Sequence, residues 1–233
     1  MSSCDSNEHS DEQPARQYAR EVLVLGIGNI LWADEGFGPR CAQAFADAYD
    51  DAPGVDVMDG GTLGGYLINE ITSSRRILVF DCCDFHDKPG TMRVLTGDDI
   101  ALWSATKISP HQTGFNDLLA TAALLGLSPE AVAVVGVQPE ILDDYGGSLS
   151  ATLHPLVDKA VQMGREALKD WGFELHPRAK DAAKPELADE VLSMARYEAE
   201  RPSAADACRV GDERFLNRMT PDALVGRPED DLA

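Results

Sequence analysis

The sequence predicts an α/β protein built around a mostly parallel sheet of five strands. Five short apolar runs alternate with segments whose apolar residues recur at helical spacing, and such alternation is typical of a parallel sheet covered by helices on both faces. At 233 residues, with 44% hydrophobic side chains, the chain is long enough for one sizeable core. A disulfide-stapled miniprotein and a wholly disordered chain are both excluded.

The first half of the core alternates strand and helix. Residues 21–30 are aliphatic and end in glycines, which predicts a first strand, and a helix with Pro39 near its start should follow. A second strand over residues 55–58 runs into Gly60 and Gly61. A short helix then leads to the strand 76–81, which is apolar throughout until Asp81.

The second half adds two strands and two helices. Pro89 and Gly90 form a turn into residues 91–95, whose closeness to the preceding strand predicts a hairpin and one antiparallel member. A helix carrying Phe115 and Leu118 should lead to the last strand, residues 131–137. A closing helix is expected near residues 151–171.

Both ends of the chain differ from this core in composition. Residues 1–19 are polar and acidic without periodicity, which indicates a flexible tail, and residues 20–172 form the predicted α/β domain. From residue 173 to residue 233 prolines and charges are scattered through a polar extension. Within it Leu187, Val191 and Met194 have the spacing of one amphipathic helix.

Charge and cysteine usage restrict the classes of partner. Forty acidic and twenty basic residues give a formal charge of −20, which would repel a nucleic-acid backbone. The longest apolar stretch, residues 22–32, is too short to span a bilayer, and the N-terminus has no features of a secretory signal. Five cysteines without a Cys-x-x-Cys pair predict reduced thiols and a cytoplasmic protein. Cys82 and Cys83 are interpreted as small buried hydrophobic residues.

Gly26 and Gly28 follow the first strand as in a dinucleotide-binding fingerprint, but Leu31 stands where that motif needs its third glycine. The sequence also lacks a His-Glu-x-x-His zinc motif, a Gly-x-Ser-x-Gly elbow and a phosphate-binding loop. The glycines are therefore expected to form a tight turn at the carboxyl edge of the sheet, and no cofactor-binding residues are assigned.

Three polar residues are candidates for chemistry at that edge, where open α/β sheets bind their ligands. Glu35 lies in the loop after the first strand, Asp81 ends the third strand, and His111 lies in a loop that opens onto a helix. Each has a structural alternative: Glu35 can favour the positive end of a helix, Asp81 can be structural, and His111 can cap a helix. One imidazole and two carboxylates suit nickel, zinc, manganese or iron, and leave positions for water or substrate. Such a site can perform hydrolysis without a serine or cysteine nucleophile.

Several spaced motifs resemble those of the hydrogenase maturation endopeptidases. They cover residues 20–172 in order: Leu25-Gly-Ile-Gly-Asn-Ile-Leu31, Asp34-Glu35-Gly36-Phe-Gly38, Asp59-Gly60-Gly61-Thr62, Asp81, Pro89-Gly90-Thr91, Lys107-Ile-Ser-Pro-His111-Gln112 and Gly136-Val-Gln-Pro-Glu140.

The resemblance implies a cytoplasmic, monomeric endopeptidase, aspartic-type by family convention, with a three-layer α/β/α fold. Its substrate would be the precursor of a nickel-iron hydrogenase large subunit, from which it removes a C-terminal peptide after nickel insertion. Nickel would arrive with that precursor and be held by Glu35, Asp81 and His111.

The resemblance leaves other residues and both chain ends less determined. Asn29, Asp34 and Gln112 are expected to orient the ligands. The loop of Asp59 is either functional or only a glycine turn. Members of the family usually end soon after the last helix, so the long extension and the acidic tail are unexpected.

Two other functions stay open on the sequence. A non-catalytic chaperone or metallochaperone would bind the nickel-loaded precursor without turnover. A nucleotide-binding α/β enzyme is the weaker alternative, and a thermal shift with nucleotides would be its signature.

Overall fold

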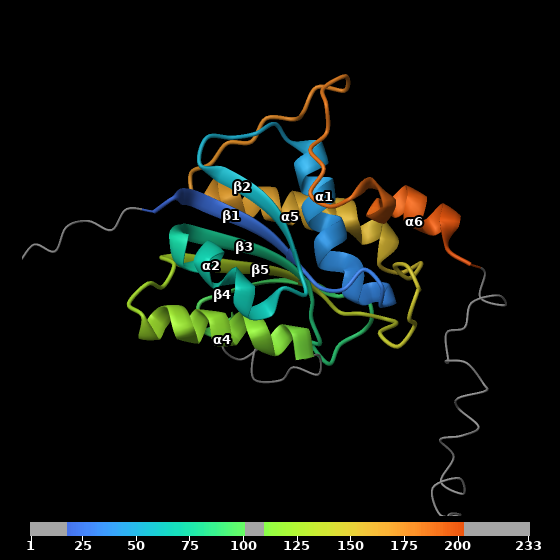
Figure 1. Cartoon of the computed structure of the whole chain (residues 1–233), viewed down its shortest axis with the longest axis horizontal. Coiled ribbons are helices and arrows are strands. Elements are labelled where there is room, and N and C mark those ends of the chain that lie inside the picture. The colour runs from blue at the N-terminus through green and yellow to red at the C-terminus, as the bar shows by residue number, and fades with distance from the viewer. Residues whose placement is uncertain (1–17, 101–109, 203–233) are drawn as a thin grey trace, which may run out of the picture.

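The computed structural model describes residues 18–100 and 110–202, and for residues 110–114 it describes the backbone alone. Five strands form one sheet in the order β2-β1-β3-β5-β4 (Figure 1). Their bounds are β1 Arg20–Ile27, β2 Val55–Gly61, β3 Ser74–Cys82, β4 Met92–Thr96 and β5 Ala131–Val137. No helix in the described ranges is long and apolar enough to cross a membrane.

Helices cover both faces of the sheet, which confirms the predicted fold class (Figure 1). One face packs against α1 and α5, and the other against α2 and α4. The helices are α1 Phe37–Ala48, α2 Ile68–Ser73, α4 Pro110–Leu124, α5 Val157–Asp170 and α6 Met194–Glu200, with 3-10 turns η1 Ala33–Gly36, η2 Gly64–Leu67, η3 His154–Leu156 and η4 Glu190–Leu192.

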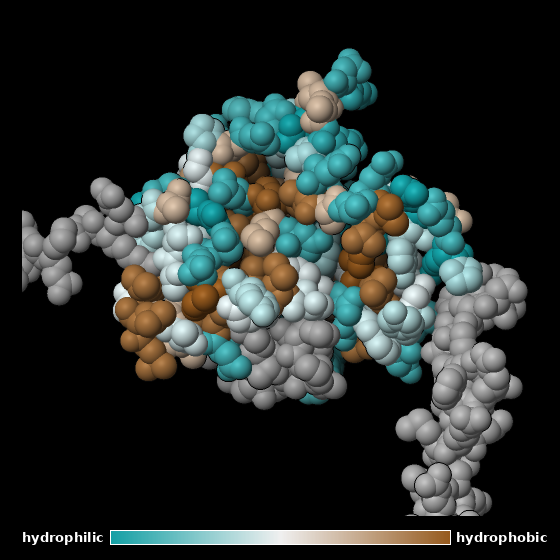
Figure 2. Space-filling model, in the orientation of Figure 1, coloured by the Kyte–Doolittle hydropathy of each residue, from teal (hydrophilic) through white to brown (hydrophobic). Residues whose placement is uncertain are grey.

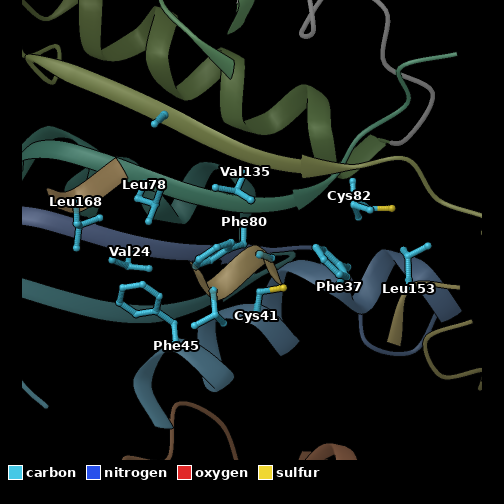
Figure 3. Close-up of a cluster of buried hydrophobic side chains, with 14 of the residues drawn as sticks. Val24, Phe37, Cys41, Phe45, Leu78, Phe80, Cys82, Val135, Leu153 and Leu168 are labelled. Atoms are coloured by element: carbon cyan, nitrogen blue, oxygen red, sulfur yellow. The ribbon is translucent and has the colours of Figure 1, made fainter. Parts of the chain in front are cut away.

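Alternation along the central strands divides the core in two. Leu78 and Phe80 of β3 face α1 and α5, where Figure 3 shows them packed with Phe37 and Phe45. Ile77 and Val79 face α2 and α4. Side chains of successive strand residues point to opposite faces, so Asp81 belongs to the face that α4 covers.

The antiparallel strand is where the predicted pairing is wrong. β4 is antiparallel, but it pairs with β5 from Met92↔Val137 to Thr96↔Ala133 instead of forming a hairpin with β3. Both sides of β3 are already occupied, by β1 and by β5. Although β4 follows β3 in the sequence, it therefore lies at the outer edge of the sheet, next to β5.

The polar extension continues along α1 as far as the structure describes it. It does not form the single amphipathic helix expected there: Leu187 lies in a bend outside any helix, Val191 lies in η4, and Met194 begins α6. Asp189 caps η4 by accepting a hydrogen bond from the Val191 amide at 3.0 Å. Residues 1–17 and 203–233, parts of the two predicted terminal segments, lie outside the described residues.

Candidate active site at the carboxyl edge of the sheet

The candidate site lies where the sheet changes its winding. The chain leaves β1 through α1 on one face and continues to β2, whereas after β3 it passes through the edge strand β4 and then α4 on the other face before it enters β5. The neighbouring strands β1 and β3 therefore have connections that diverge. Such a switch point leaves a crevice at the carboxyl edge, which is the usual ligand site of open α/β sheets. Glu35 lies in η1 after β1, and Asp81 is the last residue but one of β3.

Glycines allow the turn that carries Glu35 to pack directly on the strand ends. A β-carbon at Gly28, where φ is +140°, would lie 1.9 Å from the Glu35 carbonyl oxygen. At Gly38 it would lie 2.1 Å from the Ile27 carbonyl oxygen and 2.4 Å from that of Phe80. The expected tight turn is confirmed, and it brings η1 against β3. Helix α1 begins only at Phe37, after η1, so the immediate strand-to-helix turn of a dinucleotide site is not formed.

Asp34 locks this turn in place. Its side chain is fully buried and accepts three backbone hydrogen bonds: from Glu140 at 2.9 Å, from Ile141 at 2.8 Å and from Ser150 at 2.7 Å. The Asp34 amide donates to the Ile141 carbonyl at 3.1 Å. A single carboxylate thus ties the turn after β1, which carries Glu35, to the loop after β5.

Asp81 is 2% exposed and lies beside Gly136 of β5. Its Oδ1 accepts a hydrogen bond from the Cys82 amide at 2.8 Å. Burial raises the pKa of the Cys82 thiol well above its ordinary value, and the negative charges of Asp81, Asp34 and Glu35 raise it further. All three carboxylates therefore lie close enough to the Cys82 thiol to affect its pKa. Glu35 and Asp81 thus lie at the same carboxyl edge of the sheet.

His111 is the second residue of α4, whose bounds begin at Pro110. Because α4 connects the carboxyl edge to the start of β5, its first turn lies at the same edge as Glu35 and Asp81, and on the face to which Asp81 belongs. The side chains of His111 and Gln112 lie outside the described residues. Among the side chains that the structure describes, no three His, Cys, Asp or Glu residues converge as a metal site.

The loop after β3 is organised by Gln138, a residue quoted in the family motifs without a role. Gln138 is 8% exposed, and its Oε1 accepts hydrogen bonds from the Phe85 amide at 2.6 Å and the Asp87 amide at 3.3 Å. Its Nε2 donates to Asp84 at 3.1 Å. Gln138 thereby fixes the loop that follows Asp81.

Asp59 was expected in a loop, but it lies in β2, whose end is joined to the same edge. Asp59 Oδ1 accepts a hydrogen bond from the Gly61 amide at 2.8 Å, and the Gly61 carbonyl accepts one from the Gly28 amide at 3.1 Å. Burial raises the pKa of Asp59, while the Gly61 hydrogen bond and the charge of Arg40 oppose that shift. Asn29 serves its own turn, since its Oδ1 accepts a hydrogen bond from the Leu31 amide at 3.0 Å.

Exposed aromatic side chains border the site, and the sequence analysis missed them. Trp32 and Tyr145 pack edge to face with ring centroids 5.3 Å apart, although their side chains are partly exposed. The Gly146 amide donates to the Leu31 carbonyl at 2.7 Å, which joins the two loops. Trp32 and Tyr145 are more than a hundred residues apart in the sequence, so no local sequence pattern predicts their contact.

Comparisons with known proteins identify the family to which this fold belongs. A family model described as hydrogenase maturation protease matches residues 39–167. The chain is 45% identical over 197 residues to the hydrogenase expression/formation protein HoxM of Cupriavidus necator, which covers 84% of this chain and 98% of that protein. The chain belongs to the hydrogenase maturation protease family.

Solved structures of family members share the fold. The Escherichia coli hydrogenase maturating endopeptidase HybD superposes with a TM-score of 0.65 at 33% identity, covering 68% of this chain and 98% of that one. The family assignment and the endopeptidase class expected from the sequence are therefore confirmed.

The comparisons also correct the expectation that the long extension is unusual. The alignment with HoxM spans 197 residues, more than residues 1–172 contain, so it reaches into the extension. By contrast, the Escherichia coli hydrogenase 2 maturation protease aligns over 158 residues, which already cover 96% of its length. Within this family an extension of this kind is thus present in some maturation proteases and absent from others.

Proposed function

We propose that this protein removes a C-terminal peptide from the precursor of a nickel-iron hydrogenase large subunit after nickel has been inserted. The observation that carries the proposal is the placement of Glu35 and Asp81 at the switch point of a hydrogenase maturation protease fold. The chain is a member of a protease family, and this crevice is where such a sheet binds its ligands.

In the proposal, Glu35, Asp81 and His111 hold the nickel of the bound precursor. Carboxylate and imidazole ligands suit nickel, and three protein ligands leave positions for groups of the substrate. Glu35 and Asp81 both lie close enough to the buried Cys82 thiol to raise its pKa. Helix α4, which carries His111, begins at the same carboxyl edge of the sheet. The metal is part of the substrate, so the protein needs no stored ion.

The chemistry proposed for the site is hydrolysis directed by the substrate's metal. A divalent ion next to the scissile peptide can polarise its carbonyl or lower the pKa of a bound water. The protein's own contribution is placement: Asp34 and Gly28 hold the turn of Glu35, and Gln138 holds the loop beside Asp81. This mechanism would make the enzyme metal-dependent, with carboxylates as its principal functional groups.

A thiol mechanism is not supported by the cysteines that the structure describes. Cys41, Cys82 and Cys83 are buried, and burial raises the pKa of the Cys41 and Cys82 thiols well above the ordinary value. A buried protonated thiol is a poor nucleophile. Reduced thiols also accord with the proposed cytoplasmic location, where the protein would act as a monomer.

The test is to mix the purified protein with a large-subunit precursor, either nickel-loaded or nickel-free, at one enzyme to fifty precursors. Loss of a C-terminal peptide from most of the loaded precursor, followed by intact mass, is the expected result. Stable binding without cleavage would instead indicate the chaperone function. Equal cleavage of the nickel-free precursor would refute the role of the substrate's metal.

A further inference from the structure

The extension after α5 is fixed along α1 by specific polar contacts (Figure 1). The Asp50 amide donates to the His176 carbonyl at 2.9 Å, and the Arg178 amide donates to the Ala48 carbonyl at 2.9 Å. Farther along, the side chain of Gln43 donates to the Pro185 carbonyl at 2.7 Å and accepts from the Leu187 amide at 3.1 Å. These hydrogen bonds pack the described part of the extension, as far as residue 202, against the α/β domain.

Its last helix is joined to the loop beside the candidate site. Glu198 of α6 accepts a hydrogen bond from the Ser148 hydroxyl at 2.6 Å, and the Tyr197 hydroxyl donates to the Gly147 carbonyl at 3.4 Å. Gly147 also forms a β-bridge with Trp32 in the turn that leads to Glu35. A continuous series of contacts thus runs from α6 to the candidate site.

Between α1 and the extension the chain leaves a groove of about 410 Å³. Its walls come from α1, from residues 184–195, from the loop after β1 through Ile30 and from the end of β2 through Asp59. Ala44 and Met194 are among its apolar lining residues. Figure 2 shows apolar surface beside α6, next to hydrophilic residues. We refer to this space, between α1 and residues 184–195, as the extension groove.

The extension groove adjoins the candidate site through the loop after β1. Ile30 lines the groove and belongs to the same loop as Glu35, whose carbonyl packs on Gly28. Asp59 lines the groove and, through Gly61, is hydrogen-bonded to Gly28. A chain lying in the groove would therefore run directly toward the carboxyl edge of the sheet.

The charges around the extension groove favour a cationic occupant. Five carboxylates line it, against two cations. Lys184 is paired with Asp47 at 3.0 Å, and Arg40 interacts with Asp59. Three exposed carboxylates of the rim form no ion pair within 4 Å in the described part of the chain: Glu186, Asp189 and Glu190. Arg196 interacts electrostatically with Glu190 and Asp189, but its own ion pair is with Glu200 at 2.8 Å. An apolar interior with an acidic rim matches a peptide with an apolar side chain flanked by Lys or Arg.

We propose that the extension groove binds a segment of the large-subunit precursor in which an apolar side chain is flanked by basic residues, and so selects which precursor reaches the site. This inference rests on the proposed function. The comparisons support a role in selecting the precursor, because the extension differs between relatives. HoxM shares part of the extension, whereas the 158 residues aligned with the hydrogenase 2 maturation protease are nearly the whole of that protein. The groove adds binding energy and specificity while the chemistry stays with the core.

The first test fills the groove with Ala44→Leu, which keeps a good helix former in α1. The matched control is Ala120→Leu on the exposed face of α4. With the nickel-loaded precursor, Ala44→Leu should raise KM about tenfold, the loss expected when one apolar side chain is excluded, and leave kcat unchanged. The control should behave as the wild type. An unchanged KM in Ala44→Leu would overturn the proposal.

A second test removes the rim charges without touching the packing. The double variant Glu186→Gln with Glu190→Gln should raise KM several-fold at low salt, and the difference from wild type should shrink as salt is added. Glu166→Gln with Glu174→Gln, both exposed elsewhere, is the matched control. A KM equal to that of wild type at low salt would refute the charge argument. Absence of cleavage by the wild type would instead refute the proposed function, so the two failures are distinguishable.

Discussion

The substitution Asp34→Asn tests how the turn of Glu35 is held. Asp34 is fully buried and accepts hydrogen bonds from three backbone amides. An asparagine has the same shape but only one acceptor oxygen. That oxygen can keep the pair from Glu140 and Ile141, which leaves the amide NH₂ facing the Ser150 N–H.

The expected cost follows from these contacts. One hydrogen bond to a charged acceptor is lost, two others become neutral, and a buried donor is left without its acceptor. A hydrogen bond to a charged group contributes about 1.5–3 kcal/mol, and an unsatisfied buried donor costs about 1–3 kcal/mol. We expect the free energy of unfolding to fall by about 3 kcal/mol, which lowers Tm by about 6–12 °C for a domain of this size.

Urea unfolding followed by circular dichroism measures the change in stability, and cleavage of the nickel-loaded precursor measures its effect on the site. Asp117→Asn, an exposed position in α4, is the control and should change stability by less than about 0.5 kcal/mol. The variant should lose processing activity even at temperatures where it stays folded, because the loop after β5 no longer fixes the turn. A stability loss below about 0.5 kcal/mol, or full activity in a destabilised variant, would refute the reasoning.

Three further predictions concern single features of the fold. Gly28→Ala should destabilise the protein by at least about 1–3 kcal/mol and abolish processing, because a β-carbon there would lie 1.9 Å from the Glu35 carbonyl oxygen. A variant that melts and cleaves the precursor like the wild type would contradict this prediction. Iodoacetamide should leave processing intact, and peptide mapping of the native protein should find no label on the three buried cysteines. Asp59→Asn should keep its hydrogen bond to Gly61 and stabilise the protein at neutral pH. Because the pKa of Asp59 is raised in the folded protein, the wild type becomes less stable as pH rises from the ordinary pKa, near 3.8, through the folded pKa. The stability that Asp59→Asn gains over the wild type, measured by urea unfolding, should therefore grow over that pH window. A gain that is independent of pH would show that the shift is absent.

The fold was largely predictable because its strands are apolar over their whole length. Residues 131–137 form β5 with the predicted bounds, since a continuous aliphatic run is typical of a strand buried on both faces. The partner of β4 was not predictable from its closeness to β3. Pairing depends on which edge is free, and β3 has β1 and β5 on its two sides.

The candidate site was predictable in its residue types and only partly in its arrangement. Asp81 could be singled out because an acid that ends an apolar strand has no simple structural reason to be buried. The three backbone amides that hold Asp34 could not be predicted, because they come from residues 106 to 116 positions away. The Gln43 contacts that fix the extension on α1 are likewise long-range and have no local sequence pattern.

The most direct measurement of the central claim is single-turnover cleavage of the nickel-loaded precursor by Glu35→Gln, Asp81→Asn and His111→Ala, with Asp117→Asn as control. Each of the three variants should stay folded and bind the precursor, and none should release the C-terminal peptide in the time that the wild type and the control convert all of it. Normal cleavage by Glu35→Gln would contradict the assignment of the site.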